Sequence, residues 1–212
     1  MWTKKVRFCT FSGLMKVQVD ARAIQRLATR QRGVLSKSDL QSLFAEPHSA
    51  AFVRRVRALE EIEVIRRFCR GWYVTESFDL PTLSQRLAPH SYVSFGTILA
   101  RELLIGTRPE RRVIAAKVGK TRTYVGLGNE IVHVHVAPHL DFGHAASQGV
   151  EFANAEKAVL DVLYFHLRGR RYSFDIYSDI DFTKLKKKRL SGYLTRYRNP
   201  KFVSFATGLL EL

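Results

Sequence analysis

The chain has 212 residues, 46% of them hydrophobic, so it can bury the core of one large domain or two small ones. It carries 35 Lys and Arg against 19 Asp and Glu, and this net charge of +16 favours a polyanionic partner, because each phosphate contact releases condensed counterions. Two cysteines exclude a disulfide framework and fit a reduced cytoplasm, and no apolar run is long enough to span a membrane.

Residues 1–19 are interpreted as an N-terminal extension, because they are basic and partly apolar but lack the continuous apolar stretch of a signal peptide. A helix is predicted to begin after Asp20, whose side chain can cap it. Ile24, Leu27 and Ala28 then recur at helical spacing, and Gly33 ends the helix.

Two more helices are predicted before residue 62. Ser36 and Asp39 have the spacing of a capping box for a short helix, which Pro47 terminates. The next helix covers 49–61. Its apolar face consists of Phe52, Val56 and Leu59.

A hairpin follows, with β-rich runs on either side of Cys69-Arg70-Gly71. Helix, short helix, turn, helix and hairpin within 20–76 is the order of a winged helix-turn-helix, which binds DNA with its last helix in the major groove. The alternative is a winged helix that contacts only proteins. The polar and cationic residues expected to contact bases or phosphates are Lys37, His48, Ser49, Arg54, Arg55, Arg57, Arg66, Arg67 and Arg70.

Residues 77–90 are interpreted as a linker that holds one short helix between two prolines, and a second domain is predicted over 91–212. That domain mixes helices and strands. It is predicted to contain a helix over 92–105, strands at 113–116, 123–125 and 131–136, and a helix capped by Asn154. The expected fold class is therefore α+β, an N-terminal winged helix-turn-helix followed by a mixed α/β domain.

The last part of the second domain is a basic helical tail. Residues 182–201 hold eight Lys and Arg and no acid, which is half of the net charge of the chain. Basic residues interleaved with aromatic ones can bind nucleic acid, and a solvated helical face packed on the domain is the alternative. The candidate contacts are Lys186, Lys187, Lys188 and Arg189.

Two patterns that could indicate other chemistry are weak. His133 and His135 lie on one face of a strand, but no cysteine or carboxylate pair completes a metal set at a familiar spacing. Glu156 and Asp161 suggest a nuclease, yet five residues spread them by about 140° around a helix. We therefore expect a regulator with no catalytic residues, no metal and no cofactor.

The order of elements resembles the AbiEi family, antitoxins that repress the operons of type IV toxin–antitoxin systems. The resemblance covers about 30–200. It rests on 33–36, 52–59, 65–67 and 70–73 in the first domain, and on 92–99, 142–143 and the 154–161 stretch in the second. This chain departs from the family where Asn154-Ala155 stands in place of Ser-Pro, and in its dense lysine run at 184–189.

The resemblance implies an antitoxin-type second domain and a DNA-binding autorepressor. Its partners would be double-stranded DNA with operator inverted repeats and a nucleotidyltransferase-like toxin. Two other functions stay open. One is a nuclease delivered to its substrate by the winged helix, and the other is a module whose basic tail docks an acidic protein or RNA.

Overall fold

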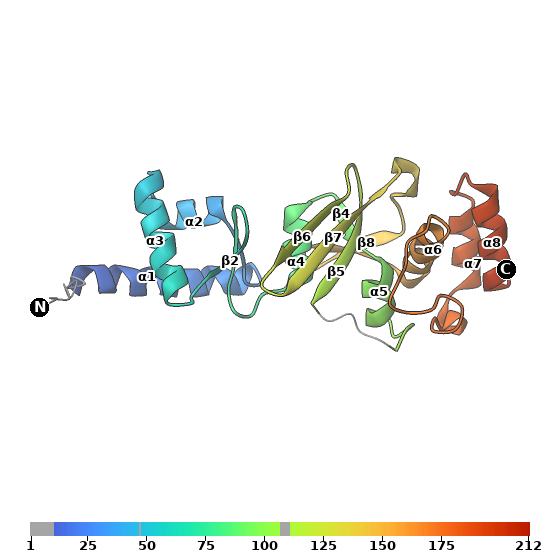
Figure 1. Ribbon diagram of the computed structural model, residues 1–212, viewed down its shortest axis with the longest axis horizontal. Coiled ribbons are helices and arrows are strands. Elements are labelled where there is room, and N and C mark those ends of the chain that lie inside the picture. Colours follow the sequence, from blue (N-terminus) through green and yellow to red (C-terminus); the bar gives the residue numbers. More distant parts are fainter. Residues whose placement is uncertain (1–10, 47, 107–110) are drawn as a thin grey trace, which may run out of the picture. The chain divides into compact units, whose positions relative to one another are not determined.

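The computed structural model describes residues 11–46, 48–106 and 111–212, and for residues 11–14 only the backbone. The chain divides into two compact units, residues 1–79 (unit 1) and residues 80–212 (unit 2), each of which combines helices with one β-sheet (Figure 1). The fold class is therefore α+β, as the sequence predicts. None of the described helices combines the length and the apolar character that a bilayer span requires.

Unit 1 begins with a longer helix than the sequence indicates. Helix α1 spans Phe11–Arg30, so it includes much of the expected extension at 1–19, whereas residues 1–10 lie outside the described residues. The prediction that Asp20 caps the start of this helix is wrong. Asp20 lies in the middle of α1 with only 6% of its surface exposed, because an arginine of another helix pairs with it there.

Gly33 ends the α1 segment for a steric reason. Its backbone is left-handed, with φ +74°, and a Cβ at this position would lie 2.6 Å from the carbonyl oxygen of Ser77. Glycine is the residue that tolerates both conditions. The chain then enters strand β1 (Val34–Ser36), which the sequence analysis did not predict.

Helix α2 (Lys37–Phe44) has the predicted capping box. The Asp39 amide donates to Ser36 Oγ at 3.1 Å, and the Ser36 amide donates to Asp39 Oδ2 at 2.7 Å. Helix α3 (Ser49–Glu61) buries Phe52, Val56 and Leu59, as its spacing predicts. Both helices contribute to one core with Ile24 of α1.

The predicted hairpin consists of β2 (Arg66–Cys69) and β3 (Trp72–Val74). Strand β3 lies in the centre of an antiparallel sheet in the order β1-β3-β2. The pairing of Ser36 with Trp72 places the start of α2 next to the hairpin turn.

Unit 2 begins earlier than predicted. Helix α4 (Leu80–Leu87), which the sequence analysis assigned to a linker over 77–90, packs on three strands of the second sheet. Leu83 and Ser84 are fully buried in that contact. The helix therefore belongs to the folded unit, because it covers apolar strand residues that would otherwise face water.

The sheet of unit 2 has six strands in the order β6-β7-β5-β4-β9-β8. The β5–β7 and β4–β9 pairs are parallel, and the other pairs are antiparallel. The bounds of the strands are β4 Ser91–Val93, β5 Arg112–Val118, β6 Arg122–Gly126, β7 Asn129–Val136, β8 His144–Ser147 and β9 Val150–Ala153.

Three of these strands confirm the predicted runs at 113–136, whereas two sequence predictions differ from the structure. The predicted helix over 92–105 is a strand, β4, followed by the shorter helix α5 (Phe95–Arg101). Strands β8 and β9 were not predicted at all. Their residues, HAAS and VEFA, form short mixed runs without a clear period of two.

Helix α6 (Ala155–His166) is capped by Asn154, which accepts from the Lys157 amide at 2.9 Å as predicted. It packs against α5, and the chain continues into α7 (Lys187–Leu194) and α8 (Pro200–Leu210). Figure 1 shows these last two helices beside α6 in unit 2. Short 3₁₀ turns at Pro138–Leu140 and Phe182–Lys184 complete the unit.

Candidate nucleic-acid interface

Helix α3 presents one continuous exposed face. Three of its residues are spaced at i, i+4 and i+8, and two more lie beside them at i+1 and i+5, so the set forms a stripe along the helix. All are exposed, and together they line a shallow open depression. The exposed α3 face consists of Ser49, Ala50, Val53, Arg54 and Arg57.

This face offers two cations and one hydroxyl to a partner. Within the described chain, neither Arg54 nor Arg57 forms an ion pair or a hydrogen bond through its side chain. These cations lie in the middle of the helix, and the stripe ends in an acid, since the exposed Glu61 lies four residues after Arg57 in the last turn. His48 precedes the face as an exposed N-cap whose side chain makes no cap hydrogen bond.

Arg55, which the sequence predicts to contact DNA, does not belong to this face, because its guanidinium is bound inside unit 1. Its Nε and Nη2 atoms donate to the two carboxylate oxygens of Asp20 at 3.0 and 2.6 Å, and Nη1 donates to the Phe44 carbonyl at 3.0 Å. The guanidinium carbon also lies 4.4 Å from the centre of the Phe44 ring. Arg55 therefore joins α1, α2 and α3 from inside unit 1.

The start of α2 adds a cation beside α3. The backbone amide of Lys37 donates to the Gly71 carbonyl at 2.8 Å, which ties the first turn of α2 to the hairpin turn. The Lys37 side chain is exposed, and its ammonium lies 5.9 Å from the centre of the Phe52 ring of α3. Lys37 and the turn residue Arg70 are thereby brought into one region of the surface.

The hairpin residues differ in their exposure. Arg67 and Arg70 are exposed, whereas Arg66 is half-buried opposite Val74. Burial raises the pKa of the Cys69 thiol, and the charge of Arg67 opposes that rise. Of the three arginines predicted for the hairpin, Arg67 and Arg70 are thus the ones best exposed to a partner.

The basic tail is partly neutralised inside unit 2. Arg189 Nη1 pairs with Glu156 at 3.0 Å, and the Lys186 amide donates to the same carboxylate at 3.1 Å. The Lys187 ammonium donates to the Glu211 carbonyl at 2.8 Å. Of the four predicted tail contacts, Lys186 and Lys188 keep exposed side chains without a described partner, so a nucleic-acid surface and a solvated helical face both stay open for the tail.

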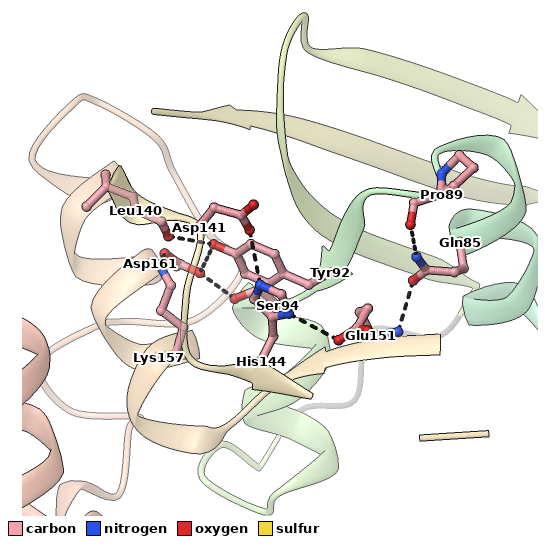
Figure 2. A network of polar contacts seen from close by, with 10 residues as sticks. All are labelled: Gln85, Pro89, Tyr92, Ser94, Leu140, Asp141, His144, Glu151, Lys157 and Asp161. Carbon is pink, nitrogen blue, oxygen red and sulfur yellow. Dashed lines mark hydrogen bonds and ion pairs between the residues drawn. The ribbon is translucent and has the colours of Figure 1, made fainter. Parts of the chain in front are cut away.

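A buried polar network lies in the core of unit 2 (Figure 2). Asp161 accepts hydrogen bonds from Ser94 Oγ at 2.7 Å and from the Tyr92 hydroxyl at 3.3 Å, and its other oxygen pairs with the Lys157 ammonium. Lys157 is fully buried, with its ammonium 4.6 Å from the centre of the Phe142 ring. Burial raises the pKa of the Tyr92 hydroxyl far above its usual value, and the charge of Asp161 adds to that rise.

This network argues against a nuclease site. Glu156 bonds to Lys186 and Arg189, whereas Asp161 bonds to Ser94, Tyr92 and Lys157. The two carboxylates therefore serve separate partners, as their angular separation predicts. Asp161 is only 1% exposed, so a substrate has no access to it.

Two histidines that could be taken for metal ligands, His133 and His144, are in contact with neighbouring side chains. His133 is fully buried, and its Nε2 lies 3.0 Å from Ser84 Oγ. Burial lowers the pKa of His133 to about 4. His144 lies between Asp141 and Glu151, at 3.1 Å from each, and stacks on the Tyr92 ring (Figure 2). Among the described residues, no group of three or more His, Cys, Asp or Glu side chains is arranged so that it could hold a metal ion.

Sequence reasoning missed two members of the exposed α3 face, Ala50 and Val53. Their spacing from Ser49, Arg54 and Arg57 carried the signal, because residues four apart share one side of a helix. It also missed the Asp20–Arg55 and Lys157–Asp161 ion pairs. The second pair has the i, i+4 spacing of a helical ion pair, and its burial is the unexpected feature.

No protein-family model and no curated protein matches this sequence. Among solved structures, the crystal structure of the RV2827C protein from Mycobacterium tuberculosis has a similar fold, with a TM-score of 0.61 and 14% sequence identity. The alignment covers 92% of this chain and 76% of that one. At this identity the likeness concerns the fold alone.

Proposed function

We propose that unit 1 is a winged helix-turn-helix and that it binds double-stranded DNA with the exposed α3 face in the major groove. The element order α1-β1-α2-α3-β2-β3 supports this proposal. The observation that carries it is the contrast within α3. Arg55 is used inside the unit, while Arg54 and Arg57 remain on the exposed α3 face without a described partner.

The chemistry of the stripe fits base and phosphate contacts. Arginine forks recognise guanine edges and phosphates, a serine hydroxyl bonds to either, and small apolar groups contact the thymine methyl. Cations on either side of α3 would contact the phosphates of the DNA backbone; these are Lys37, Arg67 and Arg70. Such contacts position the protein on the DNA and do not distinguish one base sequence from another. The net charge of +16 supports binding to a polyanion.

The more specific proposal is an autorepressor and antitoxin of a type IV toxin–antitoxin system, not an enzyme. Its support is the resemblance to the AbiEi family. The 154–161 stretch that carries much of this resemblance lies in the core of unit 2, so it supports a shared fold and identifies no toxin-contacting surface. Rescue of growth on co-expression with a neighbouring nucleotidyltransferase-like protein would test the antitoxin role.

The DNA proposal is tested by fluorescence anisotropy with the DNA upstream of the coding region and a shuffled duplex of equal length, at two salt concentrations. The variant is R54A/R57A, which leaves the internal Arg55 in place. We expect at least a tenfold loss of affinity for the upstream DNA and loss of the preference for it, because base contacts are removed.

The matched control is K120A/R122A, which removes the same charge from exposed positions of unit 2. It should weaken binding to both duplexes to a similar and smaller extent. Equal affinity of the wild-type chain for both duplexes would contradict sequence-specific binding. An R54A/R57A variant that keeps the preference would show that α3 does not read the DNA.

A further inference from the structure

Unit 2 contains a small cavity that none of the functions above uses. Its volume is about 170 Å³. It lies between the first turn of α5, strand β5 and the segment that follows α6. The lining residues are Gly96, Ile105, Arg112, Ile114 and residues 170–174.

Three of the lining residues are arginines. One of them, Arg112, forms an ion pair with a described carboxylate, that of Glu130, through its Nε atom at 2.8 Å. Arg170 is half-buried, and its guanidinium carbon lies 5.4 Å from the centre of the Phe95 ring. Burial lowers the pKa of Arg170, and the charge of Arg112 contributes to the lowering. Positive charges close together at a cavity repel each other, and a bound anion would offset this repulsion.

The segment that carries Arg170 and Arg171 is held in place from both ends of the cavity. The Tyr172 hydroxyl donates to the Val162 carbonyl of α6 at 3.1 Å, and its ring stacks on Phe174 with 5.2 Å between centroids. At Gly96 a Cβ would meet the Phe174 ring at 3.1 Å, so glycine permits this ring to close against α5. The backbone that carries the two arginines is thus held in place before any ligand arrives, which reduces the entropy cost of binding.

We propose that this cavity binds a phosphate group, either as inorganic phosphate or as the end group of a small phosphorylated metabolite. The guanidinium groups of Arg112, Arg170 and Arg171 would donate to its oxygens, since the planar fork of arginine matches phosphate geometry. Pockets for drug-sized ligands measure about 300–1,000 Å³, so this smaller cavity fits a compact anion. The proposal is independent of DNA binding by unit 1.

The first experiment is a titration of the full chain with inorganic phosphate at constant ionic strength, followed by ³¹P line broadening and by the rise in Tm. We expect saturable binding. Arg171→Gln, at an exposed position, should weaken it at least tenfold without unfolding the chain, and Arg170→Gln should weaken it further. The control is Arg168→Gln, which removes an equal charge two residues before Arg170, outside the cavity.

Three results would overturn the proposal. Wild-type protein that shows no saturable phosphate binding excludes the site. An Arg168→Gln variant that loses affinity as Arg171→Gln does would reduce the effect to general surface charge. A short DNA duplex that displaces phosphate, in a manner that depends on Arg171, would assign the cavity to a nucleic-acid surface instead. A phosphorylated sugar that competes with phosphate while the duplex does not would support the metabolite form.

Discussion

Helices α3 and α6 differ in how their charged residues are used. In α3 the cations Arg54 and Arg57 are exposed and have no described partner, whereas Arg55 of the same helix is held by Asp20. In α6 the charged residues Glu156, Lys157 and Asp161 are all buried and paired. Charge alone therefore does not indicate a binding surface. A charged side chain is available to a partner where no group of its own fold already holds it.

The comparison predicts its largest effect in α6. Asp161→Asn should lower the free energy of unfolding by about 3–5 kcal/mol, because it leaves the Lys157 ammonium buried without its counterion. Urea denaturation followed by far-ultraviolet circular dichroism measures this loss. The control is Asp141→Asn, at a partly exposed position of the same network, with an expected loss below about 1 kcal/mol. Equal losses would contradict the difference between buried and exposed charge.

Acid should weaken unit 2 through His133. Its pKa is lowered to about 4 by burial, whereas an unfolded histidine titrates near 6.5. Between these values the unfolded state binds more protons, so this contribution is complete above pH 6.5 and is lost as the pH falls toward 4. The loss should reach up to about 3 kcal/mol. Urea titrations across this range should show a flatter pH dependence for His133→Gln, and an unchanged slope would exclude this histidine as the cause.

Arg55 and Arg54 provide a test inside one helix at constant charge. Arg55→Lys should cost about 1–2 kcal/mol, because lysine cannot reproduce the two bonds to Asp20 together with the bond to the Phe44 carbonyl. Arg54→Lys should stay within about 0.5 kcal/mol. Thermal denaturation of both variants measures the two changes in stability. Equal changes in Tm would mean that Arg55 is no more structural than its exposed neighbour.

The smallest expected effect concerns Lys37. Lys37→Ala should weaken DNA binding a few-fold and equally for upstream and shuffled duplexes, because a phosphate contact carries no sequence information. The slope of log affinity against log salt should fall by about 1. Anisotropy at four salt concentrations measures both. A loss confined to the upstream duplex would instead make Lys37 a base-reading residue.

Features that depend on neighbours in the chain could be predicted from the sequence. The capping box of Ser36 and Asp39, the Asn154 cap and the β2–β3 hairpin all involve residues within a few positions of each other. The apolar face of α3 follows from the helical period, and the exposed α3 face is its complement. These predictions hold because the groups that satisfy each other are held close by the backbone itself.

Features that depend on distant partners could not be predicted. Asp20 is a good N-cap residue by type, but Arg55, 35 positions away, holds it inside a longer helix. The sequence places the helix at 80–87 in a linker, because nothing in its own residues indicates the sheet that it covers. Strands β8 and β9 lack a clear pattern of their own, and they form because β4 offers an edge to β9.

Local patterns of residues predict the helices with clear caps and periods, the hairpin, the mixed composition of the second domain and the excess of positive charge. Which of those charges face water depends on how the elements pack. A buried charge is tolerated only where a counterion or hydrogen-bond partner meets it, and the partners of Arg55, Arg189 and Asp161 include residues on other elements. Their positions follow from packing, which no local pattern of residues records.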